Sequence, residues 1–207
     1  DNSQDNQNSQ YRKGLADWDN KIAVFQNVEL NWLAASRDTL KDAVENPVTG
    51  ELKFIADANT VINTLENNIT SSETNTSSLY ASAVQFKDAA QYKTSEQLLT
   101  QGLANKNNET AMNAQGVQVS TEIINSYARA EAYKKAELDS TVRMNQLAPT
   151  LHGAGAFYFT SADLNNVQTS VDNYAAGQTN WQDQIDGTNG GFGFADRKAA
   201  AINTAAD

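Results

Sequence analysis

The chain has 207 residues, a formal net charge of −10 and no cysteine. Its acidic balance repels phosphate groups and no Lys/Arg cluster offsets this, so we expect no binding to nucleic acid or anionic lipid. The lack of cysteine excludes disulfides, thiolate metal ligands and thiol catalysis. No apolar run approaches the roughly 18 residues of a membrane span, so no membrane insertion is expected.

The N-terminal part is predicted to be a polar arm followed by a helix. Residues 1–10 contain no apolar side chain, so we expect them to form a flexible, solvated arm. Apolar residues then recur at spacings of three and four, which predicts a helix over 11–45. The predicted helix stops there because Asn46 precedes Pro47, and Asn-Pro-Val-Thr-Gly is typical of a turn.

The strongest periodic pattern belongs to a second predicted helix, over 51–102. Its stripe alternates steps of three and four through four heptads, which is typical of the seam of a long packed helix. Poor helix formers fill 70–78, but the apolar residues on either side keep the same phase, which favours one continuous helix over an interruption there. The stripe consists of Ile62, Leu65, Ile69, Ser72, Thr76, Leu79, Ala83, Phe86 and Ala90.

Three more helices are predicted in the C-terminal half, at 109–148, 161–186 and 196–206. The middle one should begin with a capping box of Thr160 and Asp163 and end at Gly187. Together the elements predict an all-α protein with a single elongated domain over 11–207. We expect a bundle of four long antiparallel coiled-coil-like helices, a short C-terminal helix and two loops rich in Gly and aromatic residues.

The sequence contains few of the residue types that carry out catalysis. His152 is the only histidine, and it lies in a Gly-rich segment without the surroundings of a catalytic triad. A four-helix di-iron site needs two histidines, and no phosphate-binding Gly-Lys-Ser/Thr motif is present. The sequence therefore predicts that the chain is not an enzyme and binds no cofactor.

Two groups of acidic residues are the candidates for a metal site. Asp38, Asp42 and Glu45 fall on one face of the first predicted helix, and Asp183 and Asp186 lie near the end of the fourth. Like charges at helical spacing repel one another unless a cation or a basic neighbour neutralises them. Calcium is the ion left open for these carboxylates, and a plain solvated face is the alternative.

Five aromatic residues decorate the two Gly-rich loops: Phe157, Tyr158, Phe159, Phe192 and Phe194. Either they pack onto the chain's own bundle, or they dock into a neighbouring copy, where aromatic side chains with little entropy are good anchors. Two short loops with five aromatics present more apolar area than one bundle end readily hides. We therefore expect these loops to form or border the main contact between subunits.

An acidic, cysteine-free chain rich in Asn, Gln and Ser, with long heptad helices over 11–185 and no initiator Met, resembles the ciliate trichocyst matrix or secretory granule lattice proteins. The resemblance implies a processed chain that is secreted or stored in granules and packs with copies of itself or homologous chains. It also implies a response to calcium. The predicted function is a non-enzymatic structural protein that self-assembles into a filament, lattice or granule matrix. The alternative is a monomeric helical surface or adhesin-type binding module.

Overall fold

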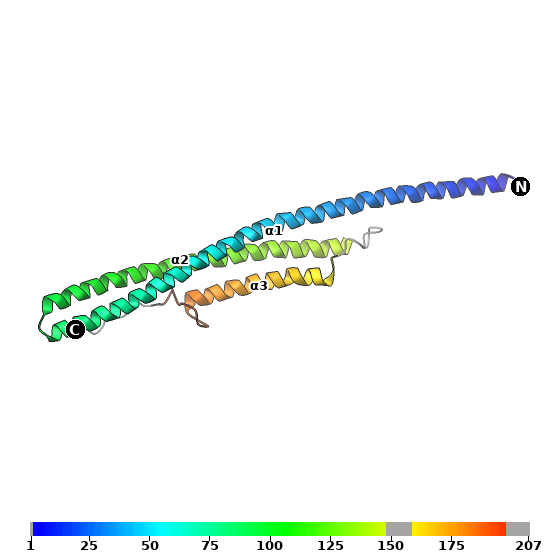
Figure 1. The fold of residues 1–207 in the computed structure, drawn as a ribbon. Helices are drawn as coiled ribbons and strands as arrows, with labels where there is room; N and C mark the ends of the chain where they lie inside the picture. The colour runs from blue at the N-terminus through cyan, green and yellow to red at the C-terminus, as the bar shows by residue number, and fades with distance from the viewer. Residues whose placement is uncertain (1, 148–158, 198–207) are drawn as a thin grey trace. The chain divides into compact units, whose positions relative to one another are not determined.

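The computed structural model describes residues 2–147 and 159–197. This part of the chain forms three helices, α1 (Asn2–Asp88), α2 (Tyr92–Leu147) and α3 (Ser161–Asp186), which Figure 1 shows in chain order. The described residues include no strand, so the prediction of an all-α protein is confirmed. The short helix predicted over 196–206 falls almost wholly outside the described residues.

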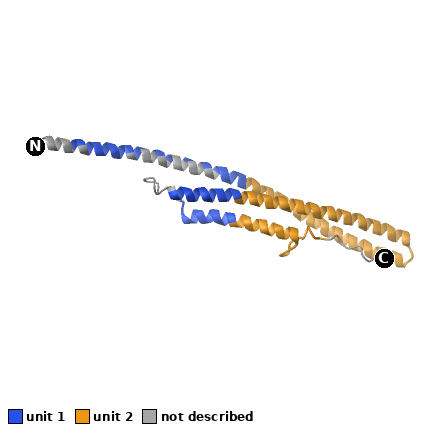
Figure 2. Cartoon of the chain, turned by 180° about the vertical axis from the view of Figure 1, so that it is seen from behind, with its two compact units in different colours: residues 1–48, 132–171 blue, residues 49–131, 172–207 orange. Residues whose placement is uncertain are grey.

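The chain divides into two compact units, coloured separately in Figure 2. Unit 1 combines residues 1–48 and 132–171, and unit 2 combines residues 49–131 and 172–207. Each of the three helices contributes one part to each unit. The single domain expected over 11–207 stays a prediction, and the units are described separately below.

Two predicted features of the N-terminal part are wrong, because α1 is helical without interruption from Asn2 to Asp88. Residues 2–10 contain neither Gly nor Pro, so nothing in them stops a helix that propagates from the residues that follow. Pro47 lies inside the helix, although a Pro interior to a helix costs about 3 kcal/mol. Val44 and Val48 beside it are 4% and 3% exposed, and burying each contributes about 1.5–3 kcal/mol, which offsets that cost.

The turn between α1 and α2 lies at 89–91 and not near 103–108, where the sequence placed it. Ala90 has a left-handed φ of 58°. Its amide donates to the Lys87 carbonyl at 3.0 Å, and the Gln91 amide donates to the Phe86 carbonyl at 2.8 Å. These two bonds form the Schellman pattern of helix ends, in which Gly usually holds the left-handed position. The predicted helices 51–102 and 109–148 therefore had the wrong boundary between them.

The predicted seam of α1 forms the core of unit 2. Ile62 and Ile69 are fully buried, and they share one hydrophobic cluster with Ile123 of α2. The polar stretch 70–78 is helical throughout, as the phase of the stripe predicted, and Thr76 within it is completely buried. The periodicity therefore placed the core correctly as far as the end of α1.

α1 and α2 run antiparallel within unit 2, because residues late in α1 contact residues early in α2. Ser95 donates to the carbonyl of Ala83 at 2.8 Å, close to the turn. Far from the turn, the Arg129 Nε donates to Glu51 Oε1 at 2.7 Å. The bond from Arg129 lowers the pKa of Glu51 below its usual value, against the opposing effect of partial burial.

α3 begins and ends where the sequence predicted. The Thr160 amide donates to Asp163 Oδ2 at 2.8 Å, and the Asp163 amide donates to Thr160 Oγ1 at 3.2 Å, which completes the capping box. At the other end Gly187 has a φ of 71° and its amide donates to the Asp183 carbonyl at 2.9 Å. Both boundaries depend on residue types with strong local preferences, which is why they could be predicted.

Candidate functional site

The first acidic group is not a ready-made metal site, because one of its members is already neutralised by a lysine. Glu45 accepts a hydrogen bond from Lys134 Nζ at 2.7 Å, and Glu137 accepts another from the same ammonium at 2.8 Å. Burial alone would lower the pKa of Lys134, but the bonds to both carboxylates raise it above its usual value. Asp42 is exposed, and the side chain of Asp38 lies outside the described residues.

The second acidic group is engaged by neighbouring hydroxyl and amide groups. Asp183 accepts bonds from Thr188 Oγ1 at 2.6 Å and Asn189 Nδ2 at 2.8 Å. The hydrogen bond from Asn189 is the main cause that lowers the pKa of Asp183, and the bond from Thr188 lowers it further. Both Asp186 oxygens accept from Gln182 Nε2 at 3.0 Å. In the part of the chain that the structure describes, no three His, Cys, Asp or Glu side chains gather into a metal-binding group.

The aromatic residues of the two loops take different positions. Phe194 is 2% exposed and belongs to the core of unit 2, so its side chain has no surface left for a neighbouring copy. The expected role of Phe194 in a subunit contact is therefore wrong. The ring fills space that Gly116 of α2 leaves open, because a Cβ at that position would lie 2.6 Å from the ring.

The other predicted contact residues are less buried or lie outside the described residues. Phe192 is half-buried, with its ring centroid 5.2 Å from that of Phe194. Phe159 is also half-buried, and its amide and carbonyl both bond to the side chain of Asn145. Phe157 and Tyr158 lie outside the described residues. For Phe159 and Phe192, a role between subunits stays a prediction.

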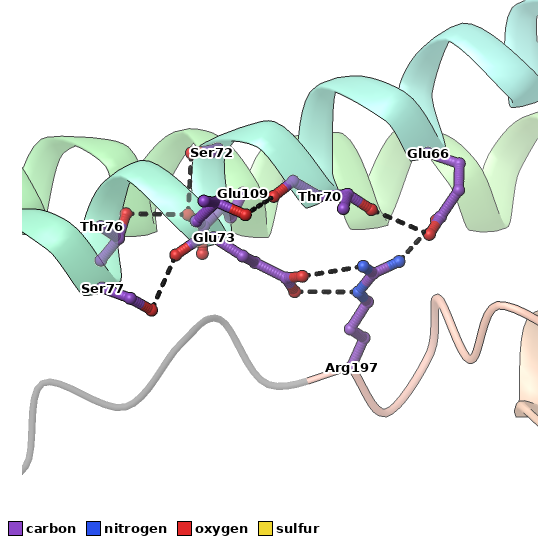
Figure 3. A network of polar contacts seen from close by, with 9 residues as sticks. Glu66, Thr70, Ser72, Glu73, Thr76, Ser77, Glu109 and Arg197 are labelled. Carbon is purple, nitrogen blue, oxygen red and sulfur yellow. Dashed lines mark hydrogen bonds and ion pairs between the residues drawn. The ribbon is translucent and has the colours of Figure 1, made fainter.

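The loop after α3 is held against the helices of unit 2 at two points. In its middle, the Gly193 amide donates to the Gln184 carbonyl at 2.8 Å, and a side chain at Gly191 would collide with the Asp183 carbonyl. At its end, the Arg197 guanidinium donates twice to Glu73, at 3.0 and 2.9 Å, and once to Glu66 (Figure 3). Such a bidentate pair fixes direction as well as distance. The loop therefore holds its aromatic residues in fixed places.

Beside this clamp, a buried polar cluster interrupts the apolar seam (Figure 3). Glu109 of α2 is completely buried, and its Oε1 accepts bonds from Ser72 at 2.8 Å and Thr76 at 3.1 Å. Its Oε2 and both polar atoms of the Asn113 side chain find no partner in the described chain. Burial is the main cause that raises the pKa of Tyr80, and the nearby Glu109 carboxyl raises it further. Buried polar groups of this kind lower stability and favour one helix register over another.

A groove on the surface of unit 2 brings together side chains that no sequence motif connects. It holds about 270 Å³ and is lined by Asn59 and Asn63 of α1, by Asn180, Trp181 and Gln184 of α3, and by Phe192. No sequence signal marks this site, because Trp181 lies on an apolar helical stripe typical of a core and isolated Asn and Gln residues form no motif. In a chain rich in these amides, only the fold shows which of them converge.

Large apolar side chains are exposed on the part of α1 that belongs to unit 1. Leu15 is 48% exposed, Trp18 66%, Val24 63% and Val28 61%. The Lys21 Nζ lies 5.7 Å from the centroid of the Trp18 ring, which is within the range of a cation–π contact. Scattered apolar residues on a surface are normal, but several within four turns of one helix indicate a contact surface.

Comparison of the chain with protein-family models, with curated proteins and with solved structures found no match. Among the described residues, no helix has both the length and the apolar character that crossing a membrane requires.

Proposed function

We propose that this chain is a non-enzymatic structural protein that associates with copies of itself through α1 of unit 1. The observation that carries the proposal is the exposed apolar surface of that helix. Leu15 and Trp18 lie three residues apart, and Val24 and Val28 four apart, so each pair presents neighbouring side chains on the helix surface.

Burial of these side chains supplies a driving force for association. Fully burying a large apolar side chain contributes about 1.5–3 kcal/mol, so a few of them offset much of the cost of bringing two chains together. A second copy presents the same two pairs of exposed apolar side chains, and a two-fold arrangement lets one surface pair with itself. In unit 2, the same helix packs through apolar residues spaced alternately three and four apart.

The proposal includes the finer architecture that the sequence predicts as far as the continuous α1 allows, an elongated antiparallel coiled-coil-like bundle. It also includes assembly into a filament, lattice or granule matrix by a secreted chain, with calcium promoting contact between acidic surfaces. The net charge of −10 supports the last point, because divalent cations reduce repulsion between like-charged copies. Immunolocalisation tests whether the chain is secreted. Light scattering with and without calcium tests whether calcium promotes assembly.

A pair of matched double variants tests the contact surface. Leu15→Ser with Trp18→Ser removes the proposed contact, whereas Leu103→Ser with Tyr92→Ser removes residues that are 50% and 67% exposed in unit 2. The two changes remove similar amounts of exposed apolar surface. Light scattering should show loss of assembly for the first pair and wild-type assembly for the second. Equal behaviour of the two pairs would overturn the proposed surface.

The alternative function, a monomeric helical binding module, is favoured by the groove between α1 and α3 of unit 2. A chain of that kind should stay monomeric at all concentrations and bind one ligand. The two functions differ in the mass of the particle in solution. The groove belongs to unit 2 in either case, and its chemistry does not depend on self-assembly.

A further inference from the structure

The groove of unit 2 has a lining with one chemical character. Four of its six residues carry carboxamides (Asn59, Asn63, Asn180 and Gln184), and the other two are the aromatic residues Trp181 and Phe192. None of the six is charged, in a chain whose net charge is −10. No hydrogen bond within the described part of the chain uses the four amide side chains. Their donors and acceptors are free for a ligand.

The aromatic walls of the groove are held rigidly. Trp181 and Phe192 both pack against the hydrophobic core of unit 2. Phe192 also contacts Phe194, and the loop that carries both rings is pinned at its far end by the ion pairs of Arg197. A site whose apolar surface is already ordered pays little entropy when a ligand arrives.

This lining excludes most classes of ligand. A cation would find no carboxylate, and an anion would find no positive charge in an acidic protein. A purely apolar ligand would cover the amides and leave their hydrogen bonds unmade, which costs affinity. What remains is a neutral molecule with many hydroxyl or amide groups and one apolar face.

The size and lining of the groove then favour a sugar ring over a peptide. About 270 Å³ lies just below the usual range of small-molecule sites and leaves room for one six-membered ring. Each carboxamide offers donors and an acceptor to sugar hydroxyls, and the C–H face of a pyranose stacks on aromatic rings. A peptide that binds by strand addition needs a free sheet edge, and the described residues contain no strand. We propose that this groove binds a neutral pyranose ring, as a free sugar or as one residue of a glycan.

Fluorine NMR of the full chain labelled with 5-fluorotryptophan tests the proposal directly. The three tryptophans give three signals, and the one that disappears in Trp181→Phe belongs to the groove. The probes are the methyl glycosides of glucose, galactose, mannose and N-acetylglucosamine. With at least one of them, we expect the Trp181 signal to shift with a Kd of roughly 1–10 mM, as befits a single ring. The other two signals should stay in place.

Two amide variants and one control locate the binding. Asn63→Ala and Asn180→Ala should each weaken binding about fivefold, the effect of one lost hydrogen bond. Asn68→Ala removes another exposed amide of α1, outside the groove lining, and should bind like the wild type. All of these side chains are exposed, so the variants should keep their fold, which circular dichroism checks.

Three results would overturn the proposal. One is a Trp181 signal that no glycoside moves, and another is wild-type affinity in the Asn63→Ala and Asn180→Ala variants. The third is a tighter response to N-acetylglycine N-methylamide than to any glycoside, which would assign the groove to a peptide. Loss of self-assembly would leave the sugar titration unaffected, so the two proposals fail separately.

Discussion

The effect of a methyl group at Gly116 should depend on the ring of Phe194. In the intact chain, a Cβ at position 116 would lie 2.6 Å from that ring, and overpacking of this kind costs about 1–3 kcal/mol. Ala is nevertheless about 1 kcal/mol more favourable than Gly inside a helix. Gly116→Ala should therefore lower the free energy of unfolding by about 0–2 kcal/mol.

Removing the Phe194 ring should reverse the sign of the effect that Gly116→Ala has on the free energy of unfolding. Phe194 is 2% exposed, so Phe194→Ala alone should cost about 3–5 kcal/mol. In that background Gly116→Ala meets no ring, and its helix propensity should raise the free energy of unfolding by about 1 kcal/mol. The two positions are thus expected to couple by about 1–3 kcal/mol.

Urea unfolding followed by far-ultraviolet circular dichroism measures all members of this cycle. The control is Gly50→Ala, because a Cβ at Gly50 would meet nothing within 4 Å. It should stabilise by about 1 kcal/mol whether or not the Phe194 ring is present. The reasoning fails if Gly116→Ala has the same effect in both backgrounds, since the loop would then not pack on α2 at this glycine.

Three further predictions concern local interactions. Ala90→Gly should raise the free energy of unfolding by about 1 kcal/mol because φ is 58° there, whereas Ala81→Gly in exposed helix should lower it by a similar amount; thermal unfolding compares them. The folded pKa of Glu51 lies below 4.5, so its stabilisation is present above that pH and is lost as the pH falls through the folded value. Glu51→Gln should therefore lose less stability on acidification than the wild type, and parallel slopes in acid unfolding titrations would contradict this. Arg197→Lys keeps the charge but loses the bidentate geometry, and amide hydrogen exchange at 193–195 should become faster; unchanged protection there would refute the clamp.

The fold could be predicted wherever periodicity or a strong local preference decided it. The stripe from Ile62 onward kept its phase through 70–78, so the sequence indicated one helix across a stretch with low helix propensity. The ends of α3 depend on a capping box and on Gly187, which act through neighbouring residues only. Such signals are local and can be read without the tertiary structure.

The predictions failed where tertiary packing overrode local chemistry. Pro47 reads as a stop, but the buried valines beside it hold the helix together. The turn at 89–91 reads as helix, because Ala90 holds a position where Gly would have marked it. The candidate site was hidden for a related reason: the amides of Asn59 and Asn180 are far apart in sequence and converge only in the fold. No spacing rule connects them.

Sedimentation equilibrium of the unmodified chain measures self-association directly. One chain has a mass of 22.5 kDa. Across micromolar to millimolar concentrations, with and without calcium, the average mass should rise above that of one chain, more steeply with calcium. A mass that stays at 22.5 kDa throughout would contradict self-assembly and leave the monomeric binding module as the function to pursue.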